Sequence, residues 1–144
     1  KEIQQLKQRA KNQGFKFAVR LNGTSDLAWH RMKVDGGSSL MQLHPDVQFY
    51  DYTKVLNYLD HDIKNYNITF SDSGANDGDI KLAMTQGHNV AVVFKNALPK
   101  KYKGRRVIDG DLHDLRFKDP RGVIVGLIAK GKARHDTNNK FVRV

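Results

Sequence analysis

Carboxylates and a histidine gather late in the chain in a spacing that could bind a metal ion. Asp109, Asp111 and Asp114 lie within six positions, and His113 stands beside the last of them. Oxygen and imidazole donors suit Mg²⁺ or Mn²⁺, and such an ion can activate water or stabilise charge on a phosphodiester. The spacing therefore predicts metal binding by Asp109 and Asp111, with Asp51 or His113 as the general base.

A structural interpretation of the same segment stays open. Asp109-Gly110 has the composition of a turn. Asp111 and Asp114 would then form ion pairs with Arg105, Arg106 or Arg116. The calcium-loop pattern is not matched, because its glycine and terminal glutamate are missing.

Other catalytic signatures are absent from the sequence. There is no phosphate-binding Gly-x-x-x-x-Gly-Lys loop, no His-Glu-x-x-His and no Gly-x-Ser-x-Gly. The chain has no cysteine, which excludes disulfides, thiolate metal sites and cysteine nucleophiles and is compatible with a cytoplasmic location. No apolar stretch approaches the roughly 18 residues that span a membrane, so we expect no membrane partner.

The net charge of +10 is concentrated in the last third of the chain. Residues 1–94 carry 11 Lys and Arg against 10 Asp and Glu, whereas residues 95–144 carry 14 against 5. Basic surfaces also occur in proteins that bind nothing specific. The concentration of positive charge in one third of the chain nevertheless favours a polyanionic partner, either nucleic acid or another phosphate-bearing ligand. Lys130, Lys132, Arg134, Lys140 and Arg143 are typical of a stripe that contacts phosphates.

The elements that must position these residues follow from apolar periodicity and turn residues. Residues 2–13 are expected to form a helix that ends at Gly14. Strands are expected at residues 15–21, 47–50, 67–70, 89–94, 107–108 and 122–129. Helices are expected at residues 26–32, 38–43, 53–66 and 76–86, and basic or acidic loops at residues 96–106 and 109–119.

Alternation of strands and helices predicts an α/β fold. Strands separated by helices are normally parallel with right-handed crossovers, so the sheet is expected to be mostly parallel. A partial barrel and an open doubly wound sheet both fit this pattern. One domain over residues 1–144 is expected, with an N-terminal helix (1–14), β-α repeats (15–94) and a basic C-terminal strand-loop region (95–144).

Polar and basic residues recur where the expected strands end. Connecting loops of a parallel sheet converge at the carboxyl ends of its strands, which is where such folds bind ligands. Strand ends are also exposed and rich in turn formers, so each position alone has an ordinary explanation. Thr53 and Lys54 would lie in the first turn of a helix, where free N–H groups favour an anion. The candidate ligand-binding residues are Arg20, Asn22, Thr53, Lys54, Ser71, Lys95, Arg105, Arg106, Arg116, Lys130 and Lys132.

Six blocks of the sequence resemble the phage and mobile-element proteins grouped as the gene 88 product family. The blocks are residues 20–26 (RLNGTSD), 46–54 (DVQFYDYTK), 67–71 (NITFS), 89–94 (NVAVVF), 107–117 (VIDGDLHDLRF) and 122–131 (GVIVGLIAKG). The resemblance runs from about residue 15 to the C-terminus. It implies a shared α/β fold, a phage or plasmid origin and a place in the cytoplasm of the bacterial host. It implies no activity, because the family has none that is settled.

Three hypotheses follow. The first is an accessory protein that binds nucleic acid or a phosphate-bearing ligand at the strand ends. The second is a phosphodiesterase or nuclease that uses Asp109, Asp111 and Asp114 with Mg²⁺ or Mn²⁺. The third is an inhibitor that covers a host defence protein with its basic face.

Overall fold

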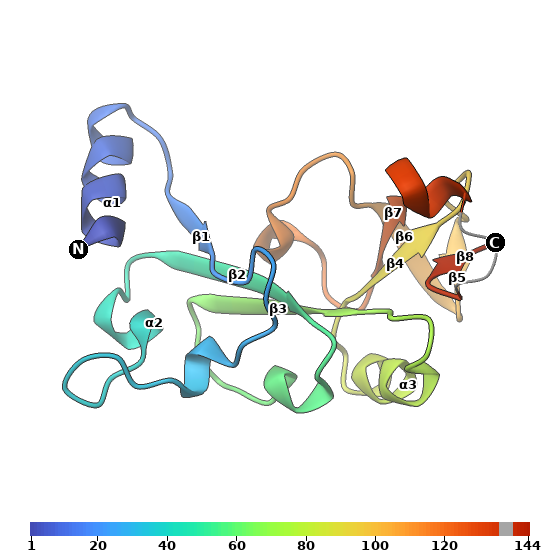
Figure 1. The fold of residues 1–144 in the computed structure, drawn as a ribbon, viewed down its shortest axis with the longest axis horizontal. Coiled ribbons are helices and arrows are strands. Elements are labelled where there is room, and N and C mark those ends of the chain that lie inside the picture. The colour runs from blue at the N-terminus through green and yellow to red at the C-terminus, as the bar shows by residue number, and fades with distance from the viewer. Residues whose placement is uncertain (136–139) are drawn as a thin grey trace.

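The computed structural model describes residues 1–135 and 140–144, in which eight strands form one open sheet (Figure 1). Along the sheet the order is β1-β2-β3-β4-β7-β6-β5, and β8 pairs with β4 outside this row. All neighbouring pairs are parallel except the β5–β6 hairpin. The strands are β1 (Ala18–Arg20), β2 (Gln48–Thr53), β3 (Tyr66–Ser71), β4 (Val90–Phe94), β5 (Lys101–Tyr102), β6 (Arg105–Asp109), β7 (Ile124–Ile128) and β8 (Val142–Arg143). The predicted α/β class is confirmed, and the sheet is not closed into a barrel.

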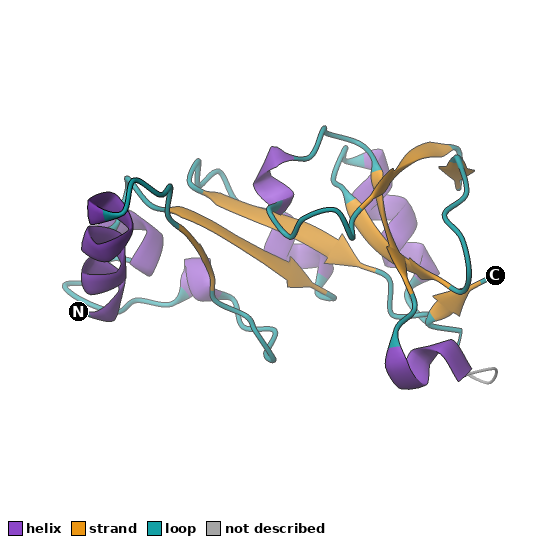
Figure 2. Cartoon of the chain, turned by 90° about the horizontal axis from the view of Figure 1, so that it is seen from above, coloured by secondary structure: helices purple, strands orange, loops and turns teal. Residues whose placement is uncertain are grey.

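Helices accompany both faces of this sheet. The α-helices are α1 (Glu2–Asn12), α2 (Leu40–Leu43) and α3 (Asp77–Thr85), and the 3-10 helices are η1 (Trp29–Arg31), η2 (Leu56–Leu59), η3 (Arg116–Lys118) and η4 (Gly131–His135). Figure 1 shows α2 and α3 below the sheet, whereas the connection from β6 to β7 crosses above it. Seen from above, α1 and η4 lie at opposite ends of the molecule (Figure 2). Among the described residues, no helix combines the length and apolar character needed to cross a bilayer.

The hydrophobic core lies mainly between the sheet and the helices on the α3 side. Ile80 and Ala83 of α3 pack with buried apolar residues of the central strands, namely Phe70, Val90, Val92, Phe94 and Ile124. A second cluster, built on Met41, Val47, Phe49 and Tyr66, fills the space nearer α1 and α2. Because side chains alternate along a strand, the residues between these core positions face the other side of the sheet.

Local patterns located several elements to within a few residues. The expected helix at residues 76–86 is α3, and the strands expected at 67–70, 89–94 and 122–129 are β3, β4 and β7. Gly14 follows the last turn of α1 with a φ of 73°, as a glycine that ends a helix does. The short helix expected at 38–43 is α2, where Ser39 and Gln42 form a capping box.

The expected helix over residues 53–66 is wrong. Residues 50–53 instead extend β2 and pair with residues 67–70 of β3, and only η2 remains helical. The side chain of Asp26 secures the turn that follows β2, because it accepts hydrogen bonds from the Thr53 hydroxyl at 2.7 Å and the Lys54 amide at 2.8 Å. The apolar spacing that suggested a helix reflects packing of Leu56 and Leu59 against the core.

Two other expected elements are shorter in the structure, and one expected loop contains strands. The strand at residues 15–21 is reduced to β1, and the helix at 26–32 is reduced to η1. The loop at 96–106 contains β5 and the start of β6, joined by a two-residue turn at Lys103 and Gly104, both with positive φ. Part of the expected basic C-terminal region, residues 136–139, lies outside the described residues.

Candidate functional site

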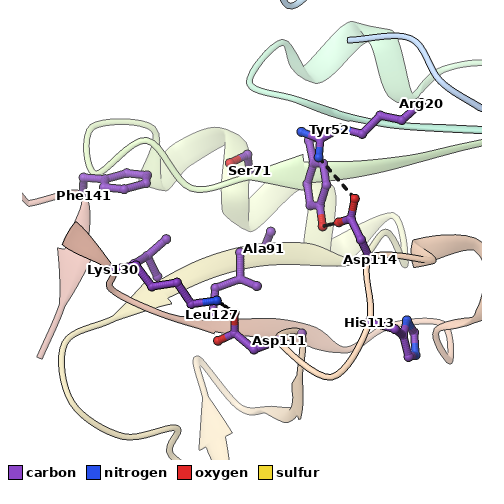
Figure 3. Close-up of a pocket in the computed structure, with 12 residues that line it drawn as sticks. Arg20, Tyr52, Ser71, Ala91, Asp111, His113, Asp114, Leu127, Lys130 and Phe141 are labelled. Carbon is purple, nitrogen blue, oxygen red and sulfur yellow. Dashed lines mark hydrogen bonds and ion pairs between the residues drawn. The ribbon is translucent and has the colours of Figure 1, made fainter. Parts of the chain in front are cut away.

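A crevice of about 500 Å³ opens at the carboxyl ends of the central strands, on the face away from α3 (Figure 3). It lies where the sheet divides, because β3 pairs with β4 only at Val90 and Ala91, while β8 pairs with β4 at Val93 and Phe94. We call it the strand-end crevice. The residues around it are Arg20, Tyr52, Ser71, Ala91, Val93, Gly110, Asp111, His113, Asp114, Leu127, Lys130 and Phe141.

Alternating side chains of the parallel strands form the floor of the crevice. Ala91 and Val93 of β4 face it because their neighbours in β4 are committed to the core on the other side. Tyr52 of β2, Ser71 of β3 and Leu127 of β7 reach the same face from their strand ends. The floor is therefore apolar at its centre, with a hydroxyl and a phenol toward the side of β2 and β3.

The loop between β6 and η3 covers one side of this floor. A Cβ atom at Gly110 would lie 2.6 Å from the Val125 side chain and 2.8 Å from that of Leu127, so the loop approaches the sheet as closely as glycine allows. Arg116 anchors the other end of the loop: its side chain is fully buried, faces Asp119 at 3.4 Å and donates to the His113 carbonyl. The loop is thus held against the sheet at both ends.

Asp114 organises the β2 side of the crevice. Its carboxylate accepts hydrogen bonds from the Tyr52 hydroxyl at 3.1 Å and the Tyr50 hydroxyl at 3.4 Å, and it pairs with Arg20 at 3.3 Å. The Arg20 guanidinium also lies 4.8 Å from the centre of the Tyr52 ring. Burial, with the charge of Asp114 adding to it, raises the pKa of Tyr52, so the phenol is a neutral hydrogen-bond donor.

Asp111 organises the opposite side. Its carboxylate accepts a hydrogen bond from the Ile128 amide at 2.8 Å and pairs with Lys130 at 2.7 Å. The hydrogen bond from Lys130 lowers the pKa of Asp111 below its usual value, so the carboxylate is ionised at neutral pH. Figure 3 shows this pair and the Arg20–Asp114 pair on opposite sides of the floor.

Comparison of the sequence with models of known protein families gives a match over nearly the whole chain. A family model described as Gene product 88 covers residues 1–143. The chain belongs to the gene product 88 family. The match confirms the resemblance seen in the sequence and extends it through α1. No curated protein matches the chain, and no solved structure does.

In this member of the gene product 88 family, the three loop aspartates do not converge. Asp109 accepts the amide of Asp111 at 2.9 Å, which forms a local turn, while Asp111 and Asp114 face different cations. Within the described residues, no group of three or more histidine or carboxylate side chains is placed to hold a metal. The donor set therefore does not fit the Mg²⁺ or Mn²⁺ site that its spacing suggested. His113 reaches the crevice, but its Nδ1 accepts the Leu115 amide at 3.2 Å.

Asp51 lies away from the crevice and has a structural role. It is buried, and it accepts hydrogen bonds from the Asn22 amide at 2.7 Å and the Tyr66 hydroxyl at 2.8 Å. Burial raises the pKa of Asp51. Asn22 is also buried, and its side-chain oxygen accepts the Leu27 amide and the Trp29 indole. The expected base Asp51 and ligand residue Asn22 both hold the β1–η1 connection.

The three other lysines expected to bind ligand, at positions 54, 95 and 132, lie in different surroundings. Lys54 does not occupy a helix N-terminus, since β2 continues to Thr53, but its ammonium lies 5.7 Å from the centre of the Phe141 ring at the crevice. Lys95 follows β4, where its amide donates to the Arg143 carbonyl at 2.9 Å. Lys132 lies in η4, which follows Lys130 along the chain.

The three expected arginines of residues 105–116 do not reach the crevice. Arg105 is at the amino end of β6, where it donates to the His88 carbonyl at 2.9 Å and to that of Met84, next to the end of α3. Arg106 pairs with Lys101 in the hairpin backbone and is exposed. Arg116 is buried and holds its own loop. Only Arg20, Ser71 and Lys130 of the expected ligand residues lie around the crevice.

Two aromatic residues of the site, Tyr52 and Phe141, are not among the candidates that the sequence suggested. Tyr52 carried a usable signal, because it lies two residues after Tyr50 in an extended strand and therefore on the same face of it. Phe141 carried none, because it arrives through pairing of the C-terminal β8 with the distant strand β4. Long-range pairing of this kind leaves no local pattern.

Proposed function

We propose that this protein is a phage or mobile-element accessory protein that binds single-stranded nucleic acid in the bacterial cytoplasm, with one nucleotide seated in the strand-end crevice. One observation carries the proposal: Arg20 and Lys130 line an open crevice together with Tyr52 and Phe141, and the Lys54 ammonium lies beside the Phe141 ring. Proteins that bind single strands combine cations, which contact the phosphate backbone, with aromatic rings, on which the bases stack. The volume of about 500 Å³ lies within the range of small-ligand sites.

The ion pairs already present in the crevice leave its cations available. The side chain of Lys130 is 76% exposed and that of Arg20 is 35% exposed, so both pairs are in contact with water. Ion pairs at such positions contribute no more than about 1 kcal/mol. A phosphate group, which carries more charge and more acceptor oxygens than a carboxylate, can therefore take over either cation.

Charge beyond the crevice supports the same ligand. Within the basic segment 95–144, exposed Lys132, Arg134 and Lys140 lie close along the chain to Lys130 and Phe141. Such a field attracts a polyanion over about 10 Å at moderate ionic strength. These basic residues would extend the contact from one nucleotide to several phosphates.

A single strand fits better than a duplex. Ala91, Val93 and Leu127 form an apolar floor, which an unpaired base can cover and a duplex backbone cannot reach. The two carboxylates beside the floor, Asp111 and Asp114, are already engaged by Lys130 and Arg20. We therefore expect little base specificity.

Titration of a labelled single-stranded oligonucleotide tests this proposal. Binding measured by fluorescence anisotropy should weaken steeply between about 50 mM and about 200 mM salt. Arg20→Gln and Lys130→Gln should each weaken binding and lower the salt slope by about one. Lys81→Gln, on the exposed side of α3, is the matched control and should change neither. Absence of binding at low salt, or equal losses in all three variants, would refute the proposal.

A further inference from the structure

A second recess lies at the other end of the sheet, between α1, the start of β1 and η3. Its volume is about 470 Å³. We call it the lysine groove. Its apolar side chains are Phe15, Phe17, Val47, Leu115 and Phe117, and its basic ones are Lys7, Lys11, Lys16 and Lys118.

The apolar part of the groove is incompletely covered. Phe15 is 69% exposed although it is a large aromatic side chain. Phe17, Leu115 and Phe117 are partly buried, and Val47 closes the bottom of the recess. On a protein surface, a contiguous apolar recess rimmed by polar residues often indicates an interaction site.

Among the described residues, three of the four rim lysines have no acidic partner. Lys7 is bonded to Asp46, which also belongs to the groove, so that pair is neutral. Within the part of the chain that the structure describes, Lys11, Lys16 and Lys118 enter no ion pair. The rim therefore carries three uncompensated positive charges around an apolar floor.

We propose that the lysine groove binds an acidic amphipathic segment of a partner protein, whose apolar face covers Phe15 and Phe17 and whose carboxylates pair with the rim lysines. A second copy of this chain is disfavoured because both copies carry a charge of +10. A bilayer is disfavoured because Val47 lies at the bottom of a recess that a flat surface does not enter. A bare nucleic-acid backbone would leave the aromatic floor uncovered.

The probe is a labelled synthetic peptide of about 18 residues, five helical turns, with leucines on one face and glutamates on the other. A scrambled peptide of the same composition and a peptide with lysine in place of glutamate are the comparisons. We expect the acidic amphipathic peptide to bind the wild-type protein at concentrations below about 1 mM and both comparison peptides to bind at least about tenfold more weakly.

Variants then locate the binding. Phe15→Ser and the double variant Lys11→Glu with Lys118→Glu should each weaken peptide binding at least about tenfold. All three positions are exposed, so melting temperatures should stay close to that of the wild type. Lys81→Glu on α3 is the matched control for charge reversal and should bind the peptide as well as the wild type does.

The outcome is separable from that of the strand-end crevice. Lys130→Gln should leave peptide binding unchanged, and Phe15→Ser should leave oligonucleotide binding unchanged. Failure of the amphipathic peptide to bind, equal binding of its scrambled form, or unaltered binding by the groove variants overturns the inference. Binding of phosphatidylglycerol vesicles or self-association that depends on Phe15, without peptide binding, would assign the groove to a membrane or to a second copy and overturn it equally.

Discussion

The guanidinium of Arg143 holds the buried carboxylate of Asp72 through two nitrogens, Nε at 2.7 Å and Nη2 at 2.9 Å. Asp72 follows β3 and Arg143 belongs to β8, so this ion pair joins β8 to the end of β3. These two strands pair with successive parts of β4 beside the strand-end crevice. The Asp72 side chain has no exposed surface. The placement of the C-terminal strand, and with it Phe141, therefore depends on a buried charge that Arg143 and the Gly74 amide satisfy.

Arg143→Gln should lower the free energy of unfolding by about 3 kcal/mol, because it leaves a buried carboxylate without its counter-charge. Urea denaturation followed by circular dichroism measures the change. Lys103→Gln is the control, since Lys103 pairs with the exposed Asp77 and its loss should cost less than about 1 kcal/mol. Equal losses in both variants would contradict the assigned role of Asp72.

Gly74→Ala should displace β8. Gly74 has a φ of 82°, and a Cβ atom there would lie 2.4 Å from the Phe141 backbone nitrogen. We expect a loss of about 2 kcal/mol or more in unfolding free energy, because strain and a backbone clash act together. Gly36→Ala separates the two causes, since Gly36 also has a positive φ but nothing within 4 Å. If both variants lose the same stability, the close approach of β8 is not the cause.

Asp111→Asn should strengthen oligonucleotide binding by about three- to tenfold at low salt, because it removes the carboxylate that pairs with Lys130. Anisotropy titration checks this expectation, and Asp79→Asn on exposed α3 should have little effect. A metal-dependent phosphodiesterase that used Asp111 would instead lose cleavage activity in the same variant. Assays with Mg²⁺, Mn²⁺ and chelator on wild type and variant therefore separate binding from catalysis.

Acid should destabilise the fold through its partly buried histidines. Burial lowers the pKa of His30, His61 and His88 in the folded protein, and the nearby charge of another histidine adds to this for His30 and His61. Both ring nitrogens of His30 are buried without a hydrogen-bond partner among the described residues. As the pH falls below about 6.5, the unfolded chain binds protons that the folded chain resists, so the free energy of unfolding decreases.

Comparison of His30→Gln with wild type isolates this effect. The fall in unfolding free energy between about pH 7.5 and pH 5.5 should be smaller in the variant. Burial raises the pKa of Asp51 and of Asp119, which acts in the opposite direction, but both residues are unchanged between the two proteins. His135→Gln, at an exposed position of η4, should keep the wild-type slope. An unchanged slope in His30→Gln would contradict the prediction.

Local patterns predicted the elements whose stability is largely local or that are buried on both faces. The apolar runs of β4 and β7 have few alternatives to a central parallel strand, and α3 begins beside Asn76 and ends before Gly87. Residues 53–66 were misassigned because their helical spacing competes with pairing between β2 and β3 and with the bonds that Asp26 makes to the turn. Those partners are distant in sequence, and a local window does not contain them.

The sequence alone determined the fold class, the asymmetry of charge and the placement of polar residues after parallel strands. Which of those residues form a site was decided by tertiary structure. Side-chain alternation assigns Asp51 and Tyr52 to opposite faces of β2, but only the packing of the sheet buries Asp51 and leaves Tyr52 at the crevice. Placing β7 between β4 and β6, and β8 against β4, requires contacts between distant segments. The stability of these contacts depends on the packing of all the strands together, so no local sequence pattern predicts them.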